Sequence, residues 1–464
     1  MILSDKYHSG VPTDHLPPKV AHTFRDPVNA KMAAVALAVG ATMTMAPTST
    51  GIGAPGTAPA PANLGRSSMA QTPQAPAAAI PFTRAATLAT MRDASRNYTA
   101  GQQDQVQLQT NAFLENVIMD VSLVTSGNSA SVAFAVDSPW QLIQQIRLDD
   151  PAGQSIIAPI TGYQLYELNK YLPDVECNFD PKWDPNYQAV TGTGATGGTI
   201  GFRLVLPIEH RRRDALGALN NSAANQRYLI TINIIPAFST LYTTAPTTEA
   251  TSINVQFYQQ YWTSPPSTIT TQQGASQTQA TPMGLGTTGY IRFERHNEVS
   301  GGGTPQIQFN NVGDYISAII FCLRDTAGAR DIYLPPQSST NANWPTEFDF
   351  WINDFQTHAL SAYGPGGTSA ATGIGGDWPR AIARFYGLHS TVESAGGLDN
   401  GVFPLFMLHG LFDKADNFSP ANQYLPTDAT TKLQIRGSTW GSGAANLEVL
   451  TRILKPISGA ALFN

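Results

Sequence analysis

Short runs of alternating apolar and polar residues recur along this chain from about residue 106 onward. Within each run the apolar residues occupy every second position, and turn-forming residues separate one run from the next. Successive side chains of a β-strand point to opposite faces of a sheet, so this period of two predicts strands with one buried face. Many short strands of this kind are typical of a β-sandwich or barrel. The clearest apolar sets are Val117, Met119, Val121 and Leu123; Val132, Phe134 and Val136; Phe202, Leu204 and Leu206; Tyr228, Ile230, Ile232 and Ile234; Ile307 and Phe309; Leu433 and Ile435; and Leu447 and Val449.

The composition supports a large β-rich protein. Of 464 residues, 42% are hydrophobic and only 13% are charged, about half the usual charged share of roughly 25%. The formal net charge of -6 argues against binding to nucleic acid, which depends on basic residues that displace counterions. Two cysteines, Cys177 and Cys322, are too few for a disulfide framework or a four-cysteine zinc site.

The first 80 residues have a different character. The apolar run Met32–Ala46 is too short to span a bilayer, which takes about 20 residues. The polar stretch before it contains Asp5, Asp14 and Asp26 and is a poor start for a signal peptide. Residues 47–81 are rich in Pro, Ala, Gly and Thr without periodicity. We expect an extended arm there that becomes ordered on a partner surface.

Two helices are predicted among the strands. Residues Thr161–Leu172 begin with a residue suited to the N-cap and place three leucines on one stripe. Residues Thr346–Leu360 space aromatic side chains three and four positions apart, which is typical of a helix with a buried face. The aromatic side chains of this second helix are interpreted as core.

A diverged internal repeat links the two halves of the chain. Residues Ile146–Gly153 and Phe321–Gly328 share the pattern Leu-x-Asp-x-Ala-Gly, and each precedes a predicted helix. Residues Ala224–Leu229 and Ala421–Leu425 share a second pattern in the same order. We infer a duplicated all-β domain, with the boundary near residue 247.

The motifs that can signal chemistry have simpler explanations. Two Gly-x-Gly-x-x-Gly matches, at Gly192–Gly197 and Gly51–Gly56, do not lie between a strand and a helix, so both are interpreted as loops. The basic run Arg211–Arg213 is interpreted as a solvated loop or an inter-subunit salt bridge, with a phosphate or lipid-head contact as the alternative. Residues Asp180–Asn186 form a predicted rigid turn, and Cys322 is predicted to be a buried thiol. We therefore predict no catalytic, cofactor-binding or metal-binding residues and no enzymatic activity.

Several segments together resemble a known protein family. They are Leu204–Ile208, Asp214–Asn220, Asn225–Ile232, Phe113–Ile118, Gly162–Tyr166 and Leu425–Ile435. In these segments the chain resembles the double jelly-roll major capsid proteins of tailless, membrane-containing icosahedral viruses, with tectivirus-like phages as the nearest type. The resemblance covers roughly residues 100–464.

This resemblance implies an all-β fold of two tandem eight-stranded jelly rolls with short inserted helices and an extended N-terminal arm. The expected segments are an arm at 1–95, a first jelly roll at 96–246, a connection at 247–289 and a second jelly roll at 290–464. The implied function is that of a structural shell protein that forms pseudo-hexameric homotrimers.

The implied location is the capsid shell of the virion, with assembly in the host cytoplasm. The implied partners are neighbouring copies, penton and minor capsid proteins and, through the arm, an internal membrane, without direct contact to nucleic acid. No cofactor is implied.

Two alternatives come from other functional classes. A secreted β-sandwich that binds or cleaves glycans would account for the Trp and Tyr content and the signal-like run. A glycan-cleaving enzyme needs two carboxylates at a set separation, and Glu167, Glu209, Glu347 and Asp349 are candidates without a selected pair. A virion spike or adhesin is the second alternative.

Overall fold

The computed structural model describes most of the chain from residue 86 to residue 456. Its contacts divide the chain into residues 1–73 and 74–464, and all described residues lie in the second unit. The described residues are 82, 86–126, 131–172, 180–210, 215–225, 227–264, 268–270, 276–278, 287–310, 314–332, 343–345, 348–359, 393, 397–406, 424–427, 430–437 and 439–456. The predicted arm therefore lies almost entirely outside the described residues.

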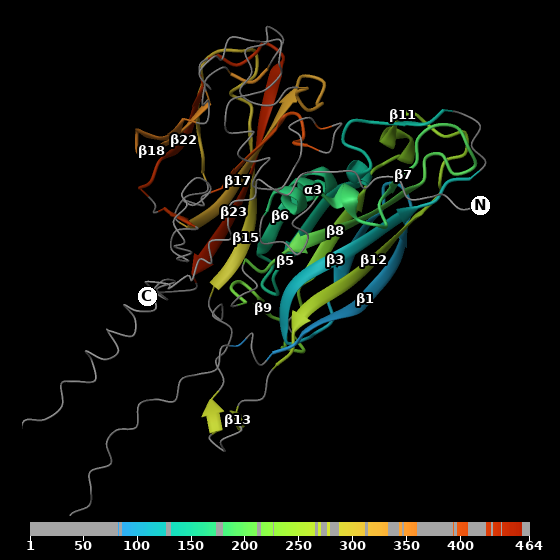
Figure 1. Cartoon of the computed structure of the whole chain (residues 1–464), viewed down its shortest axis with the longest axis vertical. Coiled ribbons are helices and arrows are strands. Elements are labelled where there is room, and N and C mark those ends of the chain that lie inside the picture. Colours follow the sequence, from blue (N-terminus) through green and yellow to red (C-terminus); the bar gives the residue numbers. More distant parts are fainter. Residues whose placement is uncertain are drawn as a thin grey trace, which may run out of the picture. The chain divides into compact units, whose positions relative to one another are not determined.

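The first half of the described chain forms two sheets of four principal strands each (Figure 1). One sheet has the order β1 (Leu88–Tyr98), β12 (Ile253–Trp262), β3 (Phe113–Leu123) and β8 (Ile200–Pro207), with β7 (Gln188–Ala189) beside β8 and β9 (Leu219–Asn220) beside β3. The other has the order β2 (Gln103–Gln107), β10 (Leu229–Ile234), β5 (Ile143–Asp149) and β6 (Ser155–Ile160). Counted along the chain, these orders are 1-8-3-6 and 2-7-4-5, which is the jelly-roll topology.

The second half repeats this topology. One strand series is β15 (Thr287–His296), β23 (Ala444–Pro456), β17 (Tyr315–Asp325) and β20 (Val402–Phe406), with β21 (Leu425–Pro426) beside β17. The other is β16 (Gln306–Gln308), β22 (Leu433–Gly437), β18 (Phe348–Ile352) and β19 (Phe355–Ala359). The orders are again 1-8-3-6 and 2-7-4-5. The predicted fold class, two tandem eight-stranded jelly rolls, is confirmed.

The predicted apolar faces form the core. A single cluster of buried side chains includes residues from both jelly rolls, among them Met119, Leu204, Ile232 and Ile435. Val136 is an exception because 61% of it is exposed, although the alternation placed it with Phe134. Val136 follows β4 (Ala133–Phe134), which has only two residues. The apolar alternation in the sequence therefore extends beyond the end of the strand.

The first predicted helix is present. Helix α3 spans Gly162–Tyr171, and Thr161 caps it by accepting a hydrogen bond from the backbone of Gln164. The side chain of Gln164 bonds back to the backbone of Thr161, which completes a capping box. This local arrangement starts the helix at the predicted residue.

The second predicted helix is wrong. Within Thr346–Leu360 the structure has an antiparallel hairpin, in which Phe350 of β18 pairs with His358 of β19. Asn353 and Asp354 make the turn with φ of 50° and 65°, the left-handed region that Asn and Asp enter more easily than most residues. Aromatic residues at spacings of three and four here lie on two short strands, and the turn signal at Asn353-Asp354 outweighs the helical spacing.

The sequence repeat has a structural cause that differs from the predicted one. Asp150 and Asp325 make the same tight turn, since each carboxylate accepts two backbone N–H bonds at 2.7–2.9 Å. Gly153 and Gly328 follow with φ of 85° and 83°. The Asp150 turn joins the fourth and fifth strands of the first jelly roll, whereas the Asp325 turn follows the third strand of the second. The jelly rolls are repeated, but these two segments are not counterparts.

The connection between the jelly rolls begins later than the predicted limit of residue 246. Strand β12 lies inside the predicted connection at 247–289, but it pairs along its length with β1 and β3 of the first jelly roll. Strand β1 similarly starts within the predicted arm. A small hairpin of β13 (Thr268–Thr270) and β14 (Ser276–Thr278) lies in the connection, and β15 begins the second jelly roll. The division into four segments otherwise stays a prediction.

Four short elements complete the described structure. They are β11 (Tyr242–Thr244), which pairs with β4, and the 3-10 helices η1 (Trp140–Leu142), η2 (Pro181–Trp183) and η3 (Phe238–Leu241). Among the described residues, no helix is long and apolar enough to cross a membrane.

Candidate functional site, the junction and the open sheet face

A sheet of the first jelly roll continues directly into a sheet of the second. Strand β6 runs parallel to β15, with Ile157 opposite Ile291. Through this pairing, the 2-7-4-5 sheet of the first jelly roll and the 1-8-3-6 sheet of the second form one larger sheet. The backbone itself therefore joins the two jelly rolls.

Helix α3 forms the centre of the junction between the jelly rolls. On the first jelly roll, the side-chain amide of Asn169 bonds to the backbone N–H and carbonyl of Val205 at 2.6 and 2.7 Å. On the second, Gln164 donates a hydrogen bond to Glu448 of β23 at 3.1 Å. The Tyr171 hydroxyl donates to Asp399 at 2.8 Å. The helix thus serves as a bridge with polar contacts on both sides.

A buried lysine connects the end of this helix to the second jelly roll. The Nζ atom of Lys170 lies 2.8 Å from Asp399 and 3.0 Å from Asp180, and all three side chains are at most 3% exposed. Lys170 also donates to the carbonyl oxygen of Gly397 at 2.9 Å. Burial alone would raise the pKa of Asp399, but Lys170 and two further cations, Lys182 and Arg330, lower it to about 2. Asp399 and Lys170 therefore both stay charged over the whole neutral range.

Two arginines of the second jelly roll form another ionic group at the same junction. Arg324 of β17 contacts Asp137 at 2.7 Å and Glu448 at 2.9 Å. Arg330 contacts the other oxygen of Asp137 at 2.7 Å and Glu393 at 3.2 Å. Asp137 belongs to the first jelly roll, so one carboxylate receives both guanidinium groups across the junction.

A third set of contacts lies at the other end of the junction. Arg452 of β23 donates to the backbone carbonyl of Glu209 at 2.7 Å, and both residues are buried. The ring of His210 lies against Gly289 of β15, where a Cβ atom would clash with the imidazole. The glycine allows the first jelly roll to approach the sheet of the second this closely.

The corresponding sheet of the first jelly roll has an outer face that is only partly covered, since Ile118 and Val205 on this face are buried and Ser122 is exposed. We call the exposed part around Ser122 and Asp120 the open face. Strand pairing places Ser95, Gln256, Asp120 and Arg203 in one row across β1, β12, β3 and β8. Arg203 binds Asp120 through two hydrogen bonds of 2.6 and 2.9 Å, and each of these side chains is about one-third exposed. The row is otherwise neutral.

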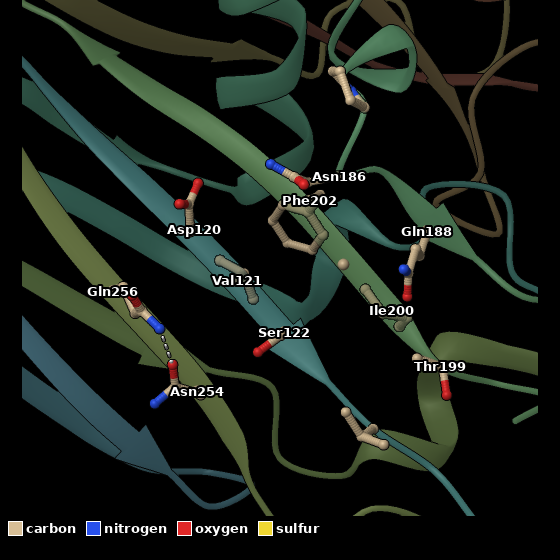
Figure 2. A pocket seen from close by; sticks show the side chains of 13 residues that line it. Asp120, Val121, Ser122, Asn186, Gln188, Thr199, Ile200, Phe202, Asn254 and Gln256 are labelled. Atoms are coloured by element: carbon tan, nitrogen blue, oxygen red, sulfur yellow. Dashed lines mark hydrogen bonds between the residues drawn. The ribbon is translucent and has the colours of Figure 1, made fainter.

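A cavity of about 320 Å³ lies on this face (Figure 2). Asn254 and Gln256 line it from β12, Ser122 lines it from β3, and Asn186 and Gln188 lie beyond β8. Gly201 has no side chain to fill the floor. The cavity thus offers amide and hydroxyl groups and little charge.

Several residues considered in the sequence have structural positions that fit their simpler interpretation. The Gly192–Gly197 segment is a loop that precedes β8, and Asp180 opens the 3-10 helix η2 and accepts a bond from Lys182 N at 2.9 Å. Cys322 is buried in β17, and burial raises the pKa of its thiol well above the usual range. Arg211–Arg213 and Gly51–Gly56 lie outside the described residues.

The carboxylates considered for glycan cleavage do not gather at an open site. Glu167 is fully buried in α3, and Glu209 is 4% exposed and accepts a hydrogen bond from the Trp262 indole at 3.0 Å. Asp349 lies on β18 of the other jelly roll, and Glu347 is outside the described residues. Within the described ranges, no group of three or more His, Cys, Asp or Glu side chains is arranged to hold a metal ion.

No protein-family model matches the sequence, and no curated protein matches it. Solved structures with the same fold exist despite this. The major capsid protein of Sulfolobus turreted icosahedral virus, in its crystal structure, is 12% identical with a TM-score of 0.50, over 80% of this chain and 97% of that chain. A chain in the atomic structure of the same virus is 11% identical with a TM-score of 0.51, over 80% of this chain and 91% of that chain. The fold is that of double jelly-roll major capsid proteins. At this identity the likeness concerns the fold.

Proposed function

We propose that this chain is a viral major capsid protein, a structural shell subunit that assembles as pseudo-hexameric homotrimers in an icosahedral shell. The fold shared with major capsid proteins supports the general role. The observation that carries the trimer is the difference between two equivalent sheets of the chain. The first jelly roll covers the 1-8-3-6 sheet of the second, whereas the same sheet of the first jelly roll is exposed around Ser122 and Asp120.

The junction inside the chain is a pattern that neighbouring copies can repeat. Within the chain, the fifth strand of one jelly roll, β6, pairs with the first strand of the next, β15. Their counterparts, β19 and β1, are the end strands of their sheets among the described residues. Placing β19 of one copy beside β1 of the next copy would cover the open face. Three such head-to-tail contacts close a ring of six jelly rolls.

The surface composition fits repeated contact between copies. The open face contains amides, hydroxyls and one internally paired arginine, and only 13% of the whole chain is charged. Surfaces with little unpaired charge lose little solvation energy when they are buried against one another. Neighbouring copies therefore meet without strong electrostatic repulsion.

The remaining parts of the proposal concern the particle. The subunit would be located in the virion shell after assembly in the host cytoplasm, and it would contact penton and minor capsid proteins. The arm at residues 1–95 would become ordered on neighbouring copies or at an internal membrane. The subunit acts through shape and contacts, without bond chemistry.

The test combines size-exclusion chromatography, light scattering and negative-stain imaging of the full-length chain. We expect particles of three times the 49.6 kDa chain mass with a hexagonal outline. Ser122 is exposed in the cavity of the open face, so Ser122→Arg should abolish the trimer by adding a charged side chain there. Gln105→Arg is the matched control, because Gln105 is exposed on β2 of the other sheet, and it should leave the trimer intact.

The two variants separate the trimer from the way in which it forms. A wild-type chain that stays monomeric at every concentration contradicts the trimeric shell subunit. A trimer that survives Ser122→Arg but not Gln105→Arg shows that copies meet through the other face. Both variants should keep the wild-type circular dichroism spectrum.

A further inference from the structure

One charged residue at the junction differs from all those described above. Glu167 lies in the middle of α3, between Gln164 and Lys170, and its exposed fraction is 0%. Among the residues that the structure describes, neither of its carboxyl oxygens has a hydrogen-bond partner. Lys170, by contrast, makes two ion pairs at 3.0 Å or less. Glu167 is thus a fully buried and unpaired acid at the contact between the jelly rolls.

The groups around Glu167 already contain more negative than positive charge. Arg324 and Arg330 balance only two of the three carboxylates of Asp137, Glu448 and Glu393. These carboxylates hold both guanidinium groups at 2.7–3.3 Å, so neither arginine is free to turn toward Glu167. An ionised Glu167 would add a further negative charge without a hydrogen bond to stabilise it.

In the described part of the chain, the other elements that pack on α3 do not supply a free cation. Among the described residues, their charged groups are held in ion pairs or, for Arg452 of β23, by the backbone carbonyl of Glu209, and the 3-10 helix η1 consists of uncharged residues. Two further titratable groups, Cys322 of β17 and Tyr163 of α3, also interact electrostatically with Glu167. The paired groups on the remaining elements are Arg203 with Asp120 on β8 and β3, Arg147 with Asp149 on β5, and Lys182 and Asp180 of the η2 region with the Lys170–Asp399 cluster.

We propose that Glu167 is held as a neutral carboxylic acid and that its ionisation loosens the contact between the two jelly rolls. A neutral acid costs much less to bury than an unpaired carboxylate. Ionisation leaves two routes to solvation, which are entry of water into the junction or separation of α3 from β17 and β23. Either route weakens the polar contacts that surround the helix. The junction is therefore sensitive to alkali, and this property goes beyond the proposed shell function.

The direction of the pH effect follows from the burial of the acid. Burial raises the pKa of Glu167 well above its usual range, Arg324 opposes this, and Glu448 adds to it. In the unfolded chain the acid ionises near pH 4.3. Between that pH and its pKa in the folded state, the folded chain holds one more proton than the unfolded chain. Its contribution to stability is complete below about pH 4.3 and is lost as the pH rises through the folded-state pKa.

The test compares the wild-type chain with Glu167→Gln over a range of pH. Glutamine keeps the shape of the neutral acid and cannot ionise, so the variant should lose this pH dependence. The ratio of the wild-type to the variant unfolding constant should rise about tenfold per pH unit within the window. The wild-type thermal midpoint should accordingly fall further below that of the variant as the pH increases. Hydrogen exchange should place the alkaline opening in α3 and β17.

A spectroscopic measurement tests the protonation state directly. In the infrared spectrum at neutral pH, the wild-type chain should show a C=O band of a protonated carboxylic acid that Glu167→Gln lacks. The matched control is Asp399→Asn, which removes a paired, ionised carboxylate from the same junction without touching the groups that act on Glu167. It should keep the infrared band and lower the thermal midpoint.

Two results overturn the proposal. One is a difference between the wild-type and Glu167→Gln midpoints that does not change with pH. The other is a neutral-pH infrared spectrum without the protonated-acid band. Neither depends on assembly, so both are independent of whether the chain forms shells.

Discussion

The two jelly rolls have the same strand order, but the outer faces of their equivalent sheets differ. In the second jelly roll, Arg324, Glu448 and Arg452 lie on this sheet, are at most 8% exposed and contact the first jelly roll. In the first jelly roll, the same face has Ser122 exposed and Asp120 partly exposed beside a cavity. Buried charged side chains occur where the chain itself covers the sheet, whereas the open face has small or neutral side chains and one partly exposed ion pair, Arg203 with Asp120. The topology determines the strand order of the sheet, and the outward-facing side chains determine what packs on its outer face.

The same difference appears in the ion pairs of the two faces. At the junction, Lys170, Asp180 and Asp399 are at most 3% exposed. On the open face, Arg203 and Asp120 are 34% and 31% exposed although their geometry is equally good. Breaking a buried pair leaves an uncompensated charge out of water, whereas water solvates the partner of a broken surface pair. The two pairs should therefore respond very differently to substitution.

The largest effect is expected for Lys170→Met. Methionine fills most of the space of the lysine stem but leaves Asp180 and Asp399 without their cation. We expect a loss of about 3–5 kcal/mol in the free energy of unfolding, measured by denaturant titration near neutral pH. Lys170→Arg is the control, since it restores the charge and should recover part of the loss. A loss below about 1 kcal/mol for Lys170→Met would mean that the buried ion pair contributes no more to stability than a surface pair.

The strands and the first helix were predictable because their causes are local. Alternation gave β3, β8, β10, β22 and β23, and the Thr161 cap with Gln164 gave the start of α3. Spacing also misled, because the aromatic residues of β18 and β19 fit a helical period until the Asn353-Asp354 turn is considered. The local sequence pattern was sufficient to predict an element when the residues within that element determine its structure.

The junction could not be predicted in the same way. The contact of Lys170 with Asp399 joins residues far apart in the sequence, and neither residue has a local signal for the other. From the sequence, Glu167 was one of several carboxylates without a selected pair. Polar residues lie between the leucines in Leu165–Leu172, and all residues of α3 are buried. A sequence pattern of this kind does not reveal which distant residues the polar side chains contact. The duplicated topology, once known, identifies the open sheet face as the counterpart of the covered one.

A smaller effect is expected for Gly289→Ala at the covered face. The added methyl group would overlap the His210 imidazole, which is only 1% exposed and has little space to move. Overpacking of this kind costs about 1–3 kcal/mol, which thermal unfolding of the full chain would measure. The control is Ala445→Val, which adds methyl groups at a partly exposed position of β23 and should leave the midpoint nearly unchanged. Equal midpoints for Gly289→Ala and the wild type would show that the jelly rolls are not closely packed at this point.

The smallest effect is expected for Arg203→Gln on the open face. Water can solvate Asp120 after the arginine is lost, so the free energy of unfolding of the monomer should fall by only about 0.2–1 kcal/mol. A double-mutant cycle with Asp120→Asn measures the coupling of the pair without the separate costs of each substitution. If the open face is buried between copies, the same cycle carried out on the trimer should give a larger coupling, because assembly removes the water that screens the pair. Equal couplings in monomer and trimer would show that this face remains in solvent after assembly and would direct the search for the contact to the other sheet.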